Sequence, residues 1–231
     1  CLLSRGLGDV YKRQIIIILN IYYNMPYFRN QHILFIHIPK TGGTTITNYF
    51  KKNNKLELFT TKQIFSNTKN KILPEPYDLI SLQHQTYNTL FKYQKLLNIT
   101  FNDKLQIISC VRNPYTRIIS DLLFLGFIKK TNCKLFVFNI IKKYLKKTNL
   151  DNHNIPQYKF LIDENNNLIQ NLKLFKLENL DEDLNKFGIM QNNKNIPNYD
   201  RVYLSYLNKN SIDLINNVYK KDFELFNYNM Y

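Results

Sequence analysis

A short polar loop with two adjacent glycines follows an apolar run, in the order FIHIPKTGGTTI from Phe35 to Ile46. Glycines allow the backbone to turn sharply and to approach an anion closely. The free N–H groups at the start of the following helix would then point at that anion, and the helix dipole favours its negative charge. A lysine before the glycines adds positive charge, and threonines after them add hydroxyl groups. The sequence therefore predicts a phosphate-binding type of anion site formed by Lys40, Thr41, Gly42, Gly43, Thr44 and Thr45.

This loop is not a Walker A motif. In that motif a lysine and a serine or threonine come directly after the glycines, whereas Lys40 precedes Gly42 and Gly43. An ordinary strand-to-helix turn is the alternative interpretation. The Pro-Lys pair before the glycines and the Thr-Thr pair after them favour the anion site.

A second motif, VRNPYTRIIS, extends from Val111 to Ser120 and again follows an apolar run. Outside residues 1–14 the chain has four arginines, and Arg112 and Arg117 both lie in this motif. A guanidinium group holds a phosphate through two parallel hydrogen bonds, which a lysine cannot reproduce. Ligands of a parallel sheet bind at the carboxyl ends of its strands. We therefore expect Arg112 to bind a second anion with the Ser120 hydroxyl facing it, whereas Arg117 either contributes to binding or pairs locally on its helix.

The elements that must position these loops alternate along the chain. Apolar runs bounded by turn residues are followed by stretches of helical periodicity. This alternation predicts an α/β fold with a mostly parallel sheet. The predicted strands cover residues 32–38, 78–82, 105–111 and 171–177, and the predicted helices cover residues 44–52, 87–97, 115–125, 134–147, 181–187 and a last helix capped by Ser211, with Ile212, Ile215, Tyr219, Phe223 and Phe226 on one stripe.

The composition excludes several classes of protein. Of the 231 residues 44% are hydrophobic, and there are only 6 glycines and 7 prolines, which rules out wholesale disorder and a collagen-like chain. The three cysteines have no metal-binding spacing and cannot form a disulfide framework. The formal net charge is +15, but 33 asparagines and 26 lysines are typical of an AT-rich coding sequence. Part of the positive charge therefore reflects mutational bias.

The first residues differ in composition from the rest. Residues 1–14 contain two of the six arginines and two of the six glycines, and they resemble translated adapter sequence. The apolar run at residues 15–19 is far shorter than the roughly 18–20 residues of a membrane span. We expect residues 1–24 to be a non-native or disordered leader, and residues 25–231 to form a single domain that starts near Met25.

The two anion loops, HIPKTGGTT and RNPYTRIIS, together resemble the carbohydrate sulfotransferase family of the heparan and chondroitin type. The donor substrate of that family is 3′-phosphoadenosine 5′-phosphosulfate (PAPS). Three later segments, at residues 151–161, 174–180 and 219–228, are similar to the family in the expected order, so the resemblance covers about residues 32–228.

The resemblance implies a P-loop NTPase-like, three-layer α/β sandwich. It also implies that the first motif binds the 5′-phosphosulfate and the second binds the 3′-phosphate. The implied reaction moves a sulfuryl group from PAPS to a carbohydrate hydroxyl by in-line displacement, leaves 3′,5′-ADP and requires no metal. Lys40 would lie near the bridging oxygen of the donor.

The acceptor hydroxyl must lose a proton, so a base is needed. The four histidines are His32, His37, His84 and His153. His84 follows a predicted strand and resembles the histidine that uronyl-type members of the family use as base, although Gln83 stands where a glycine is usual. His153 is the second candidate and Glu178 the third. Arg117, His153 and Gln157 are candidates for acceptor binding, and His153 and Gln157 have the alternative role of holding a loop.

Two other functions remain as alternatives. One is a P-loop-like kinase or nucleotide-binding enzyme, and the other is a non-enzymatic, basic nucleic-acid-binding module. Both fit the two anion loops less well, and no nucleic-acid partner is expected. The expected partner is a carbohydrate, with an anionic glycan as one option for the basic Lys129–Lys147 region. Animal members of the family are usually anchored in the Golgi membrane; no convincing anchor is apparent here, and the location remains open.

Overall fold

The computed structural model describes residues 27–47, 72–148, 150–186 and 200–231. The predicted leader at residues 1–24 and the end of the helix predicted over 44–52 lie outside these ranges. Within the described residues no helix is both long enough and apolar enough to cross a membrane.

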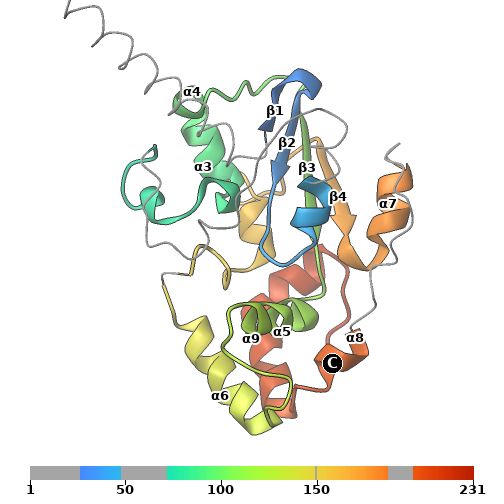
Figure 1. The fold of residues 1–231 in the computed structure, drawn as a ribbon. Coiled ribbons are helices and arrows are strands. Elements are labelled where there is room, and N and C mark those ends of the chain that lie inside the picture. Colours follow the sequence, from blue (N-terminus) through green and yellow to red (C-terminus); the bar gives the residue numbers. More distant parts are fainter. Residues whose placement is uncertain (1–26, 48–71, 149, 187–199) are drawn as a thin grey trace, which may run out of the picture.

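Four strands form one sheet in the order β1-β2-β3-β4 (Figure 1). β2 (Ile33–Ile36), β3 (Gln106–Val111) and β4 (Leu172–Lys176) are parallel, and the short β1 (Tyr27–Phe28) pairs with β2 in the antiparallel direction. The prediction of a mostly parallel α/β sheet is thus confirmed, with three of the predicted strands at slightly shorter bounds. β1 was not predicted.

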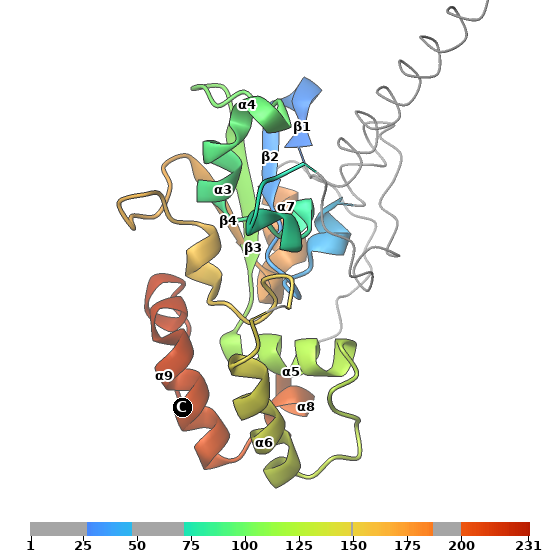
Figure 2. The same cartoon turned by 90° about the vertical axis from the view of Figure 1, so that its left-hand side faces the viewer.

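Helices cover both faces of this sheet. α3 (Tyr87–Lys92) and α4 (Gln94–Leu97) lie on one side of the strands, and α7 (Leu180–Lys186) lies on the other (Figure 1); the view in Figure 2 is from the side of α3 and α4. Successive strand residues point to opposite faces, so alternate apolar residues fill two separate cores. The buried residues include Leu34, Ile36, Ile107, Leu90 and Leu97 on the side of α3 and α4, and Phe35, Ile108, Phe175, Ile46, Leu180 and Leu184 on the side of α7.

A third core lies beyond the carboxyl ends of the strands (Figure 1). It is formed mainly by α5 (Pro114–Phe124), α6 (Lys134–Leu145) and α9 (Lys209–Leu225), with α8 (Asp200–Leu204) beside them. The predicted stripe of α9 contributes Ile215, Tyr219 and Phe223 to this core. α5 thus begins where β3 ends and connects the sheet to the helical layer.

The strand predicted over residues 78–82 is wrong. Two short 3₁₀ turns, Tyr77–Leu79 and Leu82–His84, occupy this stretch. The side-chain amide of Gln85 donates hydrogen bonds to the carbonyls of Tyr77 and Ile80, at 3.0 and 2.9 Å. A side chain therefore satisfies carbonyl groups that a neighbouring strand would otherwise have to satisfy, and the segment does not need the sheet.

Two helix boundaries also differ from the prediction. The helix predicted over residues 87–97 is divided into α3 and α4 at Tyr93, whose φ and ψ are −104° and 22°. The predicted cap Ser211 is replaced by Asn208, whose side-chain oxygen accepts a hydrogen bond from the Ser211 N–H at 2.9 Å. Asparagine and serine both serve as N-caps, so the sequence pattern did not distinguish between them.

Candidate functional site

The first predicted anion loop joins β2 to a helix that begins at Gly43. Gly42 has a φ of +90°, and its carbonyl accepts hydrogen bonds from Thr45 and Ile46 in the first turn. A Cβ atom on Gly43 would lie 2.0 Å from Nε2 of His37, and one on Gly42 would lie 2.7 Å from Leu177. A Cβ atom at either position would therefore have to displace the side chain that it meets, and the His37 ring lies directly against the loop.

Lys40 stands in the same loop with a φ of +65°, a strained conformation for a residue with a side chain. Its Nζ lies 3.8 Å from the centre of the Phe124 ring. Burial lowers the pKa of Lys40 from its ordinary value, although the Asp121 carboxylate opposes this shift. The Thr41 hydroxyl donates to the Ile38 carbonyl at 2.9 Å and so shapes the loop from within.

Arg112 brings the second motif against the first. It follows β3 directly, its Nε donates to the Thr116 hydroxyl at 2.9 Å, and one terminal nitrogen is 3.4 Å from the Lys40 carbonyl oxygen. Its guanidinium also lies 5.1 Å from the centre of the Tyr203 ring. The two anion loops therefore meet at one edge of the sheet, as their positions after β2 and β3 predict.

Two of the predicted acceptor-binding residues hold the backbone. The Gln157 side chain is fully buried and pairs with both the N–H and the carbonyl of Arg112, at 2.9 and 2.8 Å. Arg117 is 3% exposed and donates to the carbonyls of Pro39, Ile155 and His153, at 3.1, 2.9 and 2.7 Å. These bonds favour the loop-holding alternative for Gln157 and a structural role for Arg117.

His84 forms a dyad with a carboxylate. Its Nδ1 lies 2.7 Å from Asp151 Oδ2, and Asp151 in turn accepts hydrogen bonds from the N–H and the hydroxyl of Ser81, at 2.6 and 2.8 Å. Burial lowers the pKa of His84, although Asp151 opposes this shift. Burial alone would raise the pKa of Asp151, but the hydrogen bonds from His84 and Ser81 lower it. The imidazole is therefore neutral near pH 7, with Nδ1 held by the carboxylate.

A second dyad stands beside the first. His153 Nδ1 lies 2.6 Å from Asp121 Oδ1, and the other oxygen of Asp121 accepts a hydrogen bond from the Tyr144 hydroxyl. His153 is 4% exposed, and its Nε2 is buried without a hydrogen-bond partner. This nitrogen is an unused acceptor inside the protein.

The histidine rings connect the two dyads with the first loop. The centroids of His37 and His84 are 5.1 Å apart, and those of His84 and His153 are also 5.1 Å apart. The His153 ring stacks on the Phe124 ring, with their centroids 6.1 Å apart, and the Nζ of Lys40 lies over the same Phe124 ring. Burial, followed by repulsion from its two neighbouring histidines, lowers the pKa of His37 well below its ordinary value. The candidate bases and the first anion loop thus form one continuous site.

Ser120 and Glu178 are the remaining candidates. Ser120 is half-buried on the second turn of α5. Glu178 accepts hydrogen bonds from the Asn113 N–H at 2.7 Å and from the Tyr228 hydroxyl at 2.8 Å. Because both of its oxygens are engaged, Glu178 is less suited than His84 to accept a proton.

The sequence analysis did not single out Asp121, Asp151 or Phe124. Asp151 stands two residues before His153, and Asp121 directly follows Ser120, so both lie beside predicted site residues. Each carboxylate, however, bonds to a histidine more than 30 residues away, at separations of 67 and 32 residues. Proximity in the sequence therefore pointed to the region but not to the pairing.

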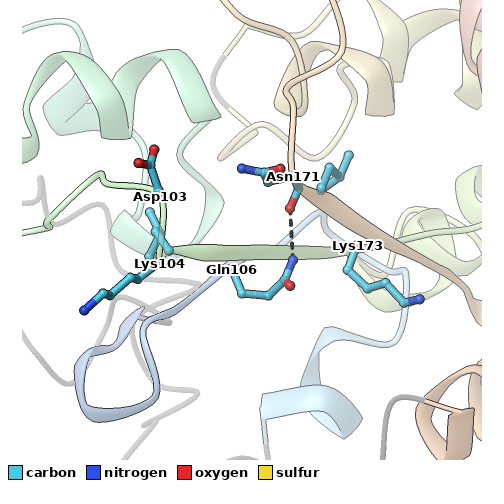
Figure 3. A pocket seen from close by; sticks show the side chains of 7 residues that line it. Asp103, Lys104, Gln106, Asn171 and Lys173 are labelled. Atoms are coloured by element: carbon cyan, nitrogen blue, oxygen red, sulfur yellow. Dashed lines mark hydrogen bonds between the residues drawn. The ribbon is translucent and has the colours of Figure 1, made fainter.

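A surface hollow lies at the opposite edge of the sheet, at the amino ends of β3 and β4 (Figure 3). There the side chain of Gln106 donates to the Asn171 carbonyl at 2.9 Å. The hollow contains none of the predicted site residues, so it is not part of the candidate site. Its lining is Asp103, Lys104, Leu105, Gln106, Asn171, Leu172 and Lys173.

Comparison with known proteins gives one match that covers most of the chain. The model of a family described as "Sulfotransferase family" matches residues 24–229, a range that contains both anion loops and both dyads. Searches of the curated proteins and of the solved structures gave no significant match.

Proposed function

Because the chain belongs to the sulfotransferase family, we propose that it transfers a sulfuryl group from PAPS to a hydroxyl of a carbohydrate acceptor. The observation that carries this proposal is the meeting of two anion loops at one edge of the sheet, where Arg112 reaches the Lys40 carbonyl. A 3′,5′-bisphosphate has two separated anionic groups and suits two such loops. The helices on both faces of the parallel sheet are compatible with a P-loop-like fold, which is part of the same proposal.

The donor-binding roles follow from the chemistry of each group. The N–H groups of Gly43 and Thr44 begin a helix, so they and the Lys40 ammonium group would stabilise the 5′-phosphosulfate. The Thr45 N–H already donates to the Gly42 carbonyl, so Thr45 would contribute through its hydroxyl. Arg112, through its guanidinium, and Ser120, through its hydroxyl, would hold the 3′-phosphate. As negative charge develops on the leaving phosphate, Lys40 would neutralise it. No step in this scheme requires a metal ion.

The acceptor would be activated by the first dyad. The acceptor hydroxyl gives its proton to the free nitrogen of His84, and its oxygen forms a bond to sulfur while the bond from sulfur to the phosphate oxygen breaks. The products are the sulfated carbohydrate and 3′,5′-ADP. Asp151 holds the imidazole in the tautomer that leaves the other nitrogen as proton acceptor, and it stabilises the imidazolium that forms.

The cofactor assignment is tested by ligand-induced stabilisation. We expect 3′,5′-ADP to raise the melting temperature without any metal, because binding to the folded state alone stabilises it by about 2.7 kcal/mol at 100 times Kd. Arg112→Lys should weaken this binding, since a point charge replaces a planar fork. The matched control is Arg29→Lys, because Arg29 bonds to the Asn98 carbonyl at the surface. Stabilisation only by ATP with magnesium would instead support a kinase.

The dyad predicts a specific pH dependence. Neutral His84 is the active form, so the rate should rise with pH through its pKa, which burial places below the ordinary value of 6.5. Asp151 raises that pKa, so Asp151→Asn should move the acidic limb of kcat to lower pH. The same substitution should lower the plateau at least about tenfold, because an amide no longer fixes the tautomer.

This profile is measured with EDTA present, using labelled PAPS and an acceptor chosen from a glycan panel. Asp103→Asn is the matched control, because Asp103 is exposed at the opposite edge of the sheet. An unchanged acidic limb in Asp151→Asn would remove Asp151 from the proposed mechanism. A merely structural role of Asp151 would lower activity equally at every pH.

A further inference from the structure

His84, Asp151 and His153 form a compact group of metal-ligating side chains. Within the described residues this is the one group of at least three histidines, cysteines or acidic residues that could hold a metal ion, and one ligand atom from each lies within 4.8 Å of the others. Both histidines are buried, and Asp151 has a side-chain exposure of 19%. The sequence suggested no such cluster, because His84 is 67 residues from Asp151.

The unpaired nitrogen of His153 points independently to a ligand. Its Nε2 is buried without a hydrogen-bond partner, although buried polar atoms normally have one. Its Nδ1 is held by Asp121 at 2.6 Å. Histidines that ligate metals usually have their second nitrogen bonded to a carboxylate in this way, which fixes the ring and raises its basicity. Asp121 thus already supplies the carboxylate support that a metal-ligating histidine usually has.

We propose that His84, Asp151 and His153 bind a divalent transition-metal ion, with Zn²⁺ as the best match, and that solvent takes the remaining position. Imidazole nitrogens and one carboxylate oxygen are a ligand set that zinc accepts, with bonds of about 2.0–2.2 Å. Ligand atoms around a tetrahedral ion of that size stand roughly 3.4 Å apart, so the three ligand atoms, which lie within 4.8 Å of one another, must approach by at most about 1.4 Å. Rotation of the side chains can supply this change.

Ion binding changes the bonding inside the first dyad. Asp151 exchanges its hydrogen bond with His84 for a bond to the ion, and it keeps its hydrogen bond from the Ser81 N–H. The coordinating nitrogen of His84 carries no proton, so the single imidazole proton resides on the other ring nitrogen, and neither nitrogen keeps a free lone pair. The lone pair needed to accept the proton of the acceptor is then unavailable. Zn²⁺ therefore acts as a reversible inhibitor, a consequence that rests on the proposed function, whereas binding itself does not.

The binding test uses the full chain after treatment with EDTA and dialysis. Titration calorimetry with ZnCl₂ should show one ion per chain, and Co²⁺ should give the visible absorption bands of a four-coordinate site. His153→Ala and Asp151→Asn should each lower the affinity at least tenfold. Asp121→Asn, which removes only the support of His153, should lower it roughly 10–100-fold.

Two controls remove competing ligands elsewhere. His32→Asn removes an exposed histidine whose φ of 52° suits asparagine, and Cys133→Ser removes an exposed thiol. Both should bind Zn²⁺ as the unmodified chain does, and circular dichroism checks the fold of every variant. Failure of the unmodified chain to bind Zn²⁺ would overturn the site. So would an affinity for Zn²⁺ that His153→Ala, Asp151→Asn and Asp121→Asn all leave unchanged.

A rate measurement separates this proposal from the proposed function. Sulfuryl transfer that Zn²⁺ abolishes and EDTA restores supports the inhibitory role. Full activity with the ion bound at these three residues overturns that role. Zn²⁺ binding by a chain that 3′,5′-ADP does not stabilise, and that sulfates no acceptor, confirms the metal site and contradicts the proposed function alone.

Discussion

His84→Ala is expected to lower the turnover number by roughly 10²–10⁴-fold, the range typical of a lost general base. The affinity for 3′,5′-ADP should remain nearly unchanged, because in the proposed mechanism His84 contacts the acceptor hydroxyl and not the donor phosphates. The two quantities are measured separately, by initial rates with labelled PAPS and by titration calorimetry with 3′,5′-ADP. Lys40→Ala should differ by lowering both, since Lys40 lies in the first anion loop.

The same assay decides between the candidate bases. His32→Asn, at the opposite end of β2, is the control and should retain full activity. Near-normal turnover in His84→Ala together with a large loss in His153→Ala would move the base to the second dyad. If neither substitution lowers turnover, neither histidine is the base, and the proton is accepted by a carboxylate or directly by solvent.

Gly43→Ala should weaken 3′,5′-ADP binding by about 10²-fold. The added Cβ would lie 2.0 Å from Nε2 of His37, a distance that no packed pair of atoms tolerates. Either the loop or the ring must move, and forcing extra volume into a packed site typically costs about 1–3 kcal/mol. The N–H groups that begin the helix would then no longer converge on the anion. Thermal stabilisation by 3′,5′-ADP across a concentration series measures the loss.

A double substitution tests the cause of this effect. His37→Ala removes the ring that the new methyl group meets, so Gly43→Ala combined with His37→Ala should recover most of the lost affinity. His37→Ala alone is the control, because it removes the same ring without adding a Cβ atom at Gly43. If the double variant binds as poorly as Gly43→Ala alone, contact with His37 is not the reason for the glycine.

The sequence predicted the frame of the molecule because local signals specify it. β2 is an apolar run and β3 is mostly apolar, with Ser109 inside it, and a proline follows each of them, at Pro39 and Pro114. Those signals also placed both anion loops at the carboxyl edge of the sheet. The stretch at residues 78–82 was mispredicted because the decisive partner, the Gln85 amide, competes with a strand only in the folded state.

The chemistry of the site was less predictable than its location. The sequence identified His84 and His153 by residue type and by resemblance, but not the carboxylates that orient them. Asp151 and Asp121 reach their histidines across turns and helices that only the tertiary fold brings together. Gln157 has no local signal either, since its side chain pairs with backbone atoms of a residue 45 positions away. Pairings of this kind depend on three-dimensional packing and leave no periodicity in the chain.

The Arg117 side chain connects two segments of the candidate site. Its single guanidinium bonds to the Pro39 carbonyl in the first anion loop and to the His153 and Ile155 carbonyls in the segment beside the second dyad. A disturbance of one segment is therefore transmitted to the other through one side chain. If the donor and the acceptor bind as proposed, their binding is thermodynamically linked through Arg117, so that each substrate changes the Kd of the other by the same factor.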